Sequence, residues 1–375
     1  MCGTIWDRSQ SPYVVQITRA IGCAVVSVDD APAGGASGNL GGRRAATIRD
    51  VAAHAGVSKS VVSRVLRDEP NVSDERRTRV RAAMAELGYR PNSIARGLSQ
   101  ARSGTVGVVI NDLRNPWYVD LLEGLATTFD AVDIAPILVD SRLDHQVGRD
   151  TVETMLSRQV DGLVVVGTTD ARVDVERAAR SIPVVLAGTL EPDLPTIDIA
   201  VDDDVVGARI ATEHLLALGH RRLAHIQGPG MVGRLRRQGF EETIAASGLP
   251  VESIAIEYGG TTEDGGYAAT ARLLDAAAPP TAILAFNDMA SLGAMSAADD
   301  RGISIPGNLS LIGYDDTQLA SLRHISLTSV DNGNFTVGAQ AAKFVLQRME
   351  RLTAPQRVYR HTPELVVRRT TAAPR

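Results

Sequence analysis

The amino-acid sequence predicts an all-α helix-turn-helix headpiece followed by an α/β domain built from two subdomains. Four short helical patterns lie between Thr47 and Leu98. From Thr105 onward the pattern changes to apolar, strand-like runs that alternate with longer amphipathic stretches, which is typical of βαβ units. The chain of 375 residues is also longer than one ordinary domain and suits two or three compact units.

Charge divides the chain at the same place. Residues 43–103 carry 13 Lys or Arg against 6 Asp or Glu, whereas residues 104–375 carry 24 against 35. A basic segment favours a polyanionic partner, because bound cations release condensed counterions from a nucleic-acid duplex. Charge alone leaves a solvated basic surface as the alternative.

The first two helical patterns have the signals of a helix-turn-helix. Thr47 is placed to cap a helix that runs to Ala55. Gly56 then allows a tight turn, and Ser58 is placed to cap a second helix that runs to about Leu66. The apolar positions expected to pack these helices together are Val51, Ala55, Val57, Val62 and Leu66.

The second helix leaves polar side chains on its outer face. These are Lys59, Ser60, Ser63 and Arg64, which a DNA major groove could meet. A third helix is predicted from its N-cap, Ser73, to its stop, Gly88, and would complete a three-helix core.

The apolar runs of the second part predict two parallel, doubly wound sheets. The runs are Thr105–Ile110, Ile134–Asp140, Gly162–Gly167, Pro183–Gly188, Arg222–Gly228, Ala282–Asn287 and Ser310–Tyr314. Near-continuous Val, Ile and Leu suit parallel strands covered by helices on both faces. The rhythm breaks over Leu190–Asp203, so we expect two sheets rather than one. Ligands in such folds lie beyond the carboxyl ends of the strands.

Residues 1–45 show no sustained period and end in Gly- and Ala-rich sequence, which predicts a flexible N-terminal extension, with an accessory segment as the alternative. Cys2 and Cys23 have no ligand-like neighbours, so we expect no disulfide, no metal site and no cofactor. The sequence has no apolar run near 18 residues and no secretion signal. We therefore expect a cytoplasmic protein without a membrane partner.

The headpiece sequence resembles a known family. The segments are TIRDVAAHAGVSKSVVSRVL, VSDERRTRVRAAMAELGYRPN and SIARGLS, and they resemble the DNA-binding headpiece of the lactose-repressor family. Similarity continues through VGVVINDLRNPWY, TEHLLALGHRRLAHIQGP, TAILAFNDMASLGAM and LSLIGYDD to about residue 370. The resemblance implies a headpiece at 46–91, a hinge helix and linker at 92–103, and an effector-binding and dimerisation domain at 104–375. That domain would resemble type I periplasmic sugar-binding proteins.

The resemblance also assigns DNA contacts. Lys59, Ser60 and Arg64 match recognition-helix positions that touch base edges, and Arg64 would favour guanine because its guanidinium donates twice to O6 and N7. A phosphate contact stays open for Lys59. Asn92 to Ser99 matches a hinge helix that forms when two protomers lie over the operator centre, and Leu98 matches its intercalating leucine. The predicted DNA-binding set is Thr47, Lys59, Ser60, Ser63, Arg64, Asn92, Ala95 and Leu98.

An effector site is implied in the same way. Arg236 matches an effector-clamping arginine of the family and Asp315 matches an acid that accepts hydroxyl groups. The predicted set is Asn111, Trp117, Tyr118, Arg236, Asn287, Asp315 and Asn332. Aromatic faces suit a sugar ring or a purine, so both ligand classes stay open, and strand-end capping is the alternative role for Asn287. Gly188 stands where many relatives place an acidic residue, and Val166 stands where some place an amide.

These features together predict a homodimeric transcriptional regulator, more specifically a repressor. It would bind a pseudo-palindromic operator in double-stranded DNA and respond to a small-molecule effector, a sugar or sugar derivative. The alternative is a corepressor-type regulator that responds to a purine or nucleoside. A solute-binding protein would need a secretion signal and has no use for residues 47–98. An enzyme would need a catalytic motif, and the chain has no GxSxG, P-loop, HExxH or strand-following GxGxxG sequence.

Overall fold

The computed structural model describes residues 46–66, 69–89, 102–146, 150–167, 172–191 and 194–375. The chain forms two compact units, residues 1–90 and residues 91–375, which we call the headpiece unit and the effector unit. The predictions for residues 1–45 and for Asn92, Ala95 and Leu98 lie outside the described residues.

The headpiece unit contains the three predicted helices, α2 (Ile48–His54), α3 (Lys59–Leu66) and α4 (Asp74–Glu86). Thr47 caps α2 in a capping box, in which the Thr47 hydroxyl accepts from the backbone N–H of Asp50 and the Asp50 carboxylate accepts from the backbone N–H of Thr47. Gly56 has a φ of +63°, a conformation that glycine adopts without strain, so the turn between α2 and α3 is tight. The three helices share one core around Val51, Val62 and Val80, each with no exposed surface.

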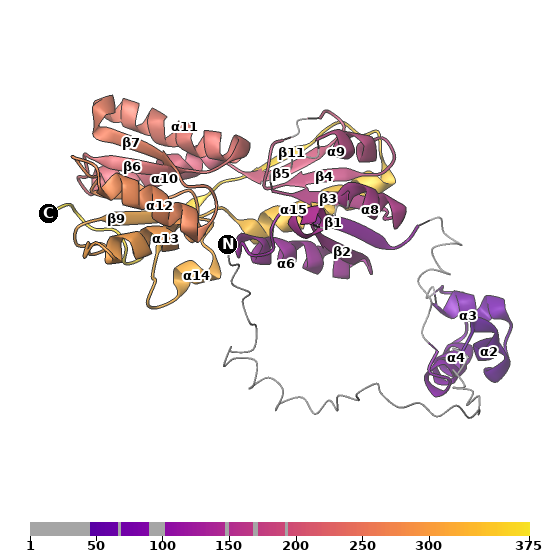
Figure 1. Ribbon diagram of the computed structural model, residues 1–375. Helices are drawn as coiled ribbons and strands as arrows, with labels where there is room; N and C mark the ends of the chain where they lie inside the picture. Colours follow the sequence, from indigo (N-terminus) through magenta and orange to yellow (C-terminus); the bar gives the residue numbers. More distant parts are fainter. Residues whose placement is uncertain (1–45, 67–68, 90–101, 147–149, 168–171, 192–193) are drawn as a thin grey trace, which may run out of the picture. The chain divides into compact units, whose positions relative to one another are not determined.

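The N-terminal lobe of the effector unit is a parallel six-stranded sheet in the order β11-β5-β4-β3-β1-β2 (Figure 1). The strands are β1 (Thr105–Ile110), β2 (Ala135–Asp140), β3 (Gly162–Val166), β4 (Val184–Ala187), β5 (Asp198–Asp202) and β11 (Val358–His361). Helices α6 (Trp117–Asp130) and α15 (Asn334–Glu350) pack on one face. Helices α8 (Thr151–Ser157) and α9 (Arg172–Ala179) pack on the other, and α7 (Ser141–Gln146) follows β2.

The C-terminal lobe repeats this architecture, with strand order β12-β10-β9-β8-β6-β7 and only β12 antiparallel to its neighbour. The strands are β6 (Leu223–Gln227), β7 (Ile254–Tyr258), β8 (Ala282–Leu284), β9 (Ser310–Tyr314), β10 (Thr328–Asp331) and β12 (Glu364–Val366). Helices α10 (Asp204–Ala217) and α11 (Gly230–Ser247) cover one face. The other face carries α12 (Glu263–Leu274) and α13 (Asp288–Asp299), while η1 (Val251–Ser253) and α14 (Gln318–Ser321) are short connectors.

Three crossover segments join the two lobes. They connect β5 to α10, β10 to α15, and β11 to β12. The first and third lie together, because the backbone N–H of Asp203 donates to the carbonyl of His361 at 3.0 Å. Polar groups at these crossovers therefore lie between the two lobes.

The two predicted sheets are present, but the strand prediction was incomplete. The interval Leu190–Asp203, which we interpreted as a break, contains β5, and β7, β10, β11 and β12 were also missed. Strand β5 was missed because it begins with Asp198 and ends with Asp202, whereas strands were predicted from continuous apolar runs. Asp198 is nevertheless fully buried.

An ion pair explains the burial of Asp198. Its carboxylate accepts from Nη2 and Nε of Arg348 at 2.6 and 2.8 Å, and from Nη2 of Arg357 at 2.6 Å. Arg348 is itself only 1 % exposed and donates its remaining hydrogens to backbone carbonyls of the segment that follows α15. The pair therefore fastens the end of α15 and the start of β11 to β5.

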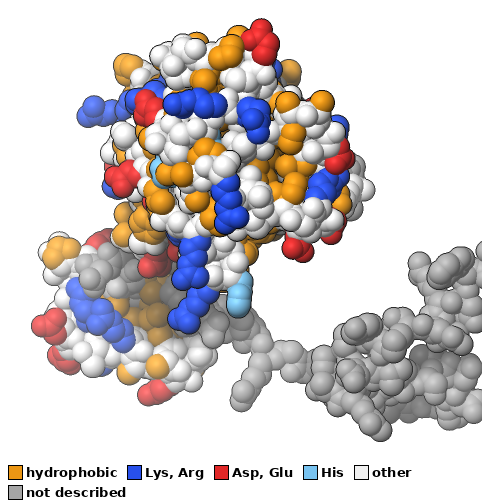
Figure 2. Space-filling model, turned by 90° about the vertical axis from the view of Figure 1, so that its left-hand side faces the viewer, with side chains coloured by type: hydrophobic (Ala, Val, Ile, Leu, Met, Phe, Trp, Pro, Cys, Tyr) orange, Lys and Arg blue, Asp and Glu red, His pale blue; other side chains and the backbone are white. Residues whose placement is uncertain are grey.

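In the described part of the chain no helix is long and apolar enough to cross a membrane. On the face shown in Figure 2, basic and acidic side chains of the effector unit are dispersed among hydrophobic ones. This face thus offers no concentrated basic patch. The basic segment of the sequence is residues 43–103, which include the helices of the headpiece unit.

The Asp198 pair predicts a large effect of a single substitution. Asp198→Ala leaves the Arg348 guanidinium buried without its counter-charge, so the free energy of unfolding is expected to fall by about 3–5 kcal/mol. Urea unfolding followed by circular dichroism measures this loss. Asp299→Ala removes an exposed carboxylate from α13 and is the control, with an expected change within about 0.5 kcal/mol. Equal losses in the two variants would contradict the role given to Asp198.

Candidate functional site

The exposed face of α3 carries the predicted DNA-reading side chains. Lys59, Ser60 and Arg64 are exposed and Ser63 is half-buried. Helix α3 contains no acidic residue, so its cationic and hydroxyl groups are not opposed by a carboxylate on the same helix. The nearest acidic partner of Arg64 is Glu69, at 3.8 Å, in an exposed pair of the kind that is easily exchanged for solvent or phosphate. This face can therefore donate hydrogen bonds to base edges and phosphates.

Thr47 has a local role in the structure. Its hydroxyl donates to the Asp50 carboxylate at 2.7 Å and completes the capping box of α2. A contact between Thr47 and DNA stays a prediction.

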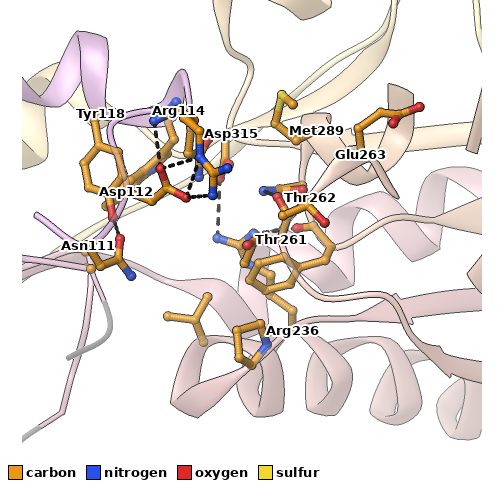
Figure 3. Close-up of a pocket in the computed structure, with 18 of the residues that line it drawn as sticks. Asn111, Asp112, Arg114, Tyr118, Arg236, Thr261, Thr262, Glu263, Met289 and Asp315 are labelled. Atoms are coloured by element: carbon orange, nitrogen blue, oxygen red, sulfur yellow. Dashed lines mark hydrogen bonds and ion pairs between the residues drawn. The ribbon is translucent and has the colours of Figure 1, made fainter. Parts of the chain in front are cut away.

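The second candidate site is a cleft of about 340 Å³ in the effector unit (Figure 3). Six of the seven residues predicted to bind an effector line it, namely Asn111, Trp117, Tyr118, Arg236, Asn287 and Asp315. The first three come from the N-terminal lobe and the others from the C-terminal lobe. Segments far apart in the sequence thus meet at the carboxyl ends of the two sheets, as expected for doubly wound folds.

Arg236, on α11, is the most heavily bonded of these residues. Its Nε donates to Asp204 at 2.8 Å, its Nη1 donates to the carbonyl of Phe286 at 2.6 Å, and its Nη2 lies 3.6 Å from Asp315. The guanidinium carbon lies 3.5 Å from the centre of the Tyr314 ring, a cation–π contact. Figure 3 shows Arg236 directed toward Asp315 within the cleft. The side chain is buried and held in one orientation.

Three carboxyl groups surround this single guanidinium. We call Asp202, Asp204 and Asp315 the acid cluster; all three are buried. The Asp202 carboxyl accepts from the Tyr314 hydroxyl at 2.9 Å. Burial raises the pKa of all three, that of Asp204 to about 7, and repulsion by neighbouring carboxylates adds to the rise at Asp204 and Asp315. One cation cannot balance three buried anions, so the cluster retains protons at pH values where exposed aspartates are ionised.

Asn332, the seventh predicted residue, lies against Asp315. Its Nδ2 donates to Asp315 Oδ1 at 3.2 Å, and its Oδ1 is buried without a hydrogen-bond partner among the described residues. The backbone of Asp315 has a φ of +100°, a strained conformation for an aspartate. A buried acceptor without a donor costs free energy, so this point of the site favours a ligand or water that donates a hydrogen bond.

Asn287 has the role given as its alternative in the sequence analysis, because it caps a helix at the end of a strand. Its Oδ1 accepts from the backbone N–H of Ala290 at 2.8 Å and caps α13, and its Nδ2 donates to the carbonyl of Thr261 at 3.2 Å. Both ends of the amide are thus engaged by the protein. An effector contact from Asn287 stays a prediction.

Sequence reasoning missed Asp202, Asp204 and Tyr314 as parts of the site. The acidic run Asp202-Asp203-Asp204 was visible, but it lies at the end of the interval Leu190–Asp203, which was interpreted as a break between sheets. Along the described ranges no group of His, Cys, Asp and Glu is arranged to hold a metal ion.

Comparisons with known proteins agree with these two sites. Residues 47–92 match the family described as bacterial regulatory proteins, lacI family, and residues 212–371 match the periplasmic binding protein-like domain. Catabolite control protein A of Priestia megaterium is 32 % identical over 329 residues, which cover 87 % of this chain and 99 % of that protein. The transcriptional regulator GalR of Escherichia coli K12 is 31 % identical over 332 residues, covering 88 % and 96 %.

Solved structures are similar over the same span. The lac repressor dimer bound to operator and the anti-inducer ONPF has a TM-score of 0.74 and 28 % identity, covering 88 % of this chain and 100 % of that one. The regulator CelR in complex with cellobiose has a TM-score of 0.66 and 28 % identity, covering 87 % and 99 %.

The acid cluster predicts how stability depends on pH. The ordinary pKa of an aspartate is 3.8, whereas that of folded Asp204 is about 7. Between these values the folded state binds more protons than the unfolded state, so the free energy of unfolding falls as pH rises, by at most about 1.4 kcal/mol per pH unit for each proton. Asp202→Asn keeps an acceptor for the Tyr314 hydroxyl and removes one titrating group. It is expected to flatten the decline between pH values of about 4 and 7.

Urea unfolding at a series of pH values measures that slope. Asp299→Asn is the control, because it removes an exposed carboxylate outside the cluster and should follow the unmodified protein. A slope for Asp202→Asn equal to that of the control would show that Asp202 does not contribute to proton binding by the cluster in this range.

Proposed function

The chain belongs to the LacI family of bacterial regulatory proteins, and on that premise we propose that a sugar or sugar derivative bound in the cleft controls its affinity for operator DNA. The chain is a DNA-binding transcriptional regulator and not an enzyme. One observation carries the proposal for the effector. Arg236 and Asp315, which suit hydroxyl groups, line the same cleft as the indole of Trp117, which suits the C–H face of a sugar ring.

The charge of the cleft supports a neutral ligand. Its lining carries four acidic side chains, Asp112, Glu263, Asp264 and Asp315, against two basic ones, Arg114 and Arg236. An excess of carboxylates repels phosphorylated sugars and nucleotides and favours uncharged polyols. The similar regulator CelR was solved with cellobiose, which supports the same ligand class.

A nucleoside is the second candidate. A base could stack on Trp117 while ribose hydroxyls meet Asp315, because aromatic rings accept both arrangements. The sugar is favoured because the polar groups of the site, Asp315 and the unsatisfied Oδ1 of Asn332, are suited to a ring that carries several hydroxyl donors.

The proposed mechanism follows from the position of the cleft at the crossovers. A ligand that touches both lobes binds one degree of lobe closure better than another and therefore shifts the population between them. In a homodimer this changes the separation of the headpieces, and with it the affinity for a pseudo-palindromic operator. Because such coupling is reciprocal, operator DNA must change effector affinity by the same factor.

The proposed DNA contacts can be tested at Arg64. The reference duplex is selected by the unmodified protein from a random DNA pool. Arg64→Ala is expected to weaken binding to this duplex by about 1–3 kcal/mol per half-site while leaving binding to random duplex nearly unchanged, as measured by gel shift at fixed salt. Arg79→Ala, which removes the same charge from the exposed face of α4, should act equally on both duplexes. Equal behaviour of the two variants would overturn base reading by Arg64.

The proposed effector site can be tested at Asp315. A thermal-shift screen of neutral sugars and nucleosides first identifies a ligand that raises the melting temperature by mass action. Asp315→Asn is expected to weaken binding of that ligand by about tenfold or more, since one carboxyl oxygen that accepts from a ligand hydroxyl is replaced by an amide donor, and to leave operator binding in the absence of ligand intact. Asp299→Asn is the exposed control. A variant that still responds at the same ligand concentration would count against this site.

A further inference from the structure

Two glycines follow neighbouring strands at the point where these strands reach the cleft. Gly167 comes directly after β3 and Gly188 directly after β4, and the two strands are paired. Both glycines line the cleft. Their φ values of +76° and +67° are readily adopted by glycine and costly for other residues. At both positions the N-terminal lobe therefore offers the cleft only backbone.

The ring of Trp117 fills the space that side chains after β4 would need. A Cβ atom on Gly188 would lie 2.4 Å from Cη2 and 2.5 Å from Cζ2 of the indole. A Cβ atom on Gly167 would lie 2.9 Å from the Tyr118 hydroxyl and 3.7 Å from Cζ3 of Trp117. The indole is packed against the core of the lobe and against the Tyr118 ring, whose centre lies 4.8 Å away. We call Trp117, Gly167 and Gly188 the indole wall.

Polar groups beside the indole wall are bonded to one another. The Tyr118 hydroxyl donates to Asn111 Oδ1, and Figure 3 shows these two side chains directed toward each other. Asp112 accepts from Arg114 Nε at 2.9 and 3.0 Å, and this hydrogen bond lowers the pKa of Asp112 to about 2. The C-terminal lobe differs, because Asn332, which lies behind Asp315, has a buried oxygen without a partner among the described residues.

We propose that the indole wall determines effector specificity by receiving a hydroxyl-free part of the ligand, so that the preferred effector is a deoxy sugar. This inference rests on the proposed function and narrows its ligand class. A hydroxyl group buried against the indole would lose its water without gaining a partner, whereas a C–H or methyl group there loses nothing. The remaining hydroxyls of the ligand face Arg236, Asp315 and Asn332.

Matched pairs of sugars test the selection. The pairs are D-galactose and D-fucose, L-mannose and L-rhamnose, and D-ribose and 2-deoxy-D-ribose. The full chain is used with Trp6→Phe, which leaves Trp117 as the only tryptophan, because the sequence contains 2. We expect the deoxy member of at least one pair to bind about tenfold more tightly than its partner and to change the emission of Trp117.

Substitution of Gly188 tests whether the indole is responsible. Gly188→Ala places a methyl group where the ring lies, and it should shift the emission of Trp117 without ligand and reduce the deoxy preference to about twofold or less. Gly248→Ala is the matched control, since Gly248 also has a positive φ, +77°, but no atom within 4 Å of its added Cβ. It should keep the preference. Trp117→Leu retains apolar volume without the ring, should also lose the preference, and covers the case in which Gly188→Ala does not fold.

The outcomes separate the inference from the proposed function. If sugars bind but hydroxylated and deoxy members bind equally, or if Gly188→Ala and Trp117→Leu keep the preference, the role of the indole wall is overturned and the sugar effector stands. If no sugar binds while operator binding persists, the proposed sugar effector is overturned, and the preference for a deoxy sugar is overturned with it. Binding of nucleosides alone has the same consequence.

Discussion

The desolvated guanidinium of Arg236 is the constraint around which the effector unit is arranged. It contacts the Asp204 carboxyl group at the start of α10, the Phe286 carbonyl after β8 and the Asp315 carboxyl group after β9. Arg236 therefore connects the crossover between β5 and α10 to the lining of the cleft. A buried charge must be satisfied by groups that hold their positions, because water cannot replace them. Elements that meet at Arg236 therefore have little freedom to move independently.

The effector unit contains two buried ionic clusters with opposite ratios of carboxyl groups to arginines. At Asp198 one carboxylate has two arginine partners, Arg348 and Arg357, and the ion pairs hold α15, β5 and β11 together. At the acid cluster three carboxyl groups share one arginine, and Asn332 is left with an unpartnered oxygen. In the first arrangement two cations hold one carboxylate between three elements of the fold, whereas in the second the carboxyl groups outnumber the cation. Only the acid cluster contributes a side chain, that of Asp315, to the lining of the cleft.

The cleft is consequently asymmetric. The N-terminal lobe offers the indole of Trp117 and polar groups that already bond to one another, and the other lobe offers the polar groups of Arg236 and Asp315. On the proposed function, a ligand with one apolar and one hydroxylated side would contact both surfaces. Its binding energy would then be available to shift lobe closure and, with it, operator affinity.

The sequence by itself determined the features that depend on near neighbours. The helix cap at Thr47, the turn at Gly56 and strands such as β3 and β9 follow from residues a few positions apart, and all were predicted correctly. Family resemblance also pointed to six residues that line the cleft. Only the tertiary structure revealed strand β5, the acid cluster and the contact between Trp117 and Gly188, because their partners are distant in sequence: Arg348 lies 150 residues beyond Asp198, and Tyr314 lies 112 beyond Asp202. Burial of a charge and the space left by a glycine are set by such distant partners, so no local pattern records them.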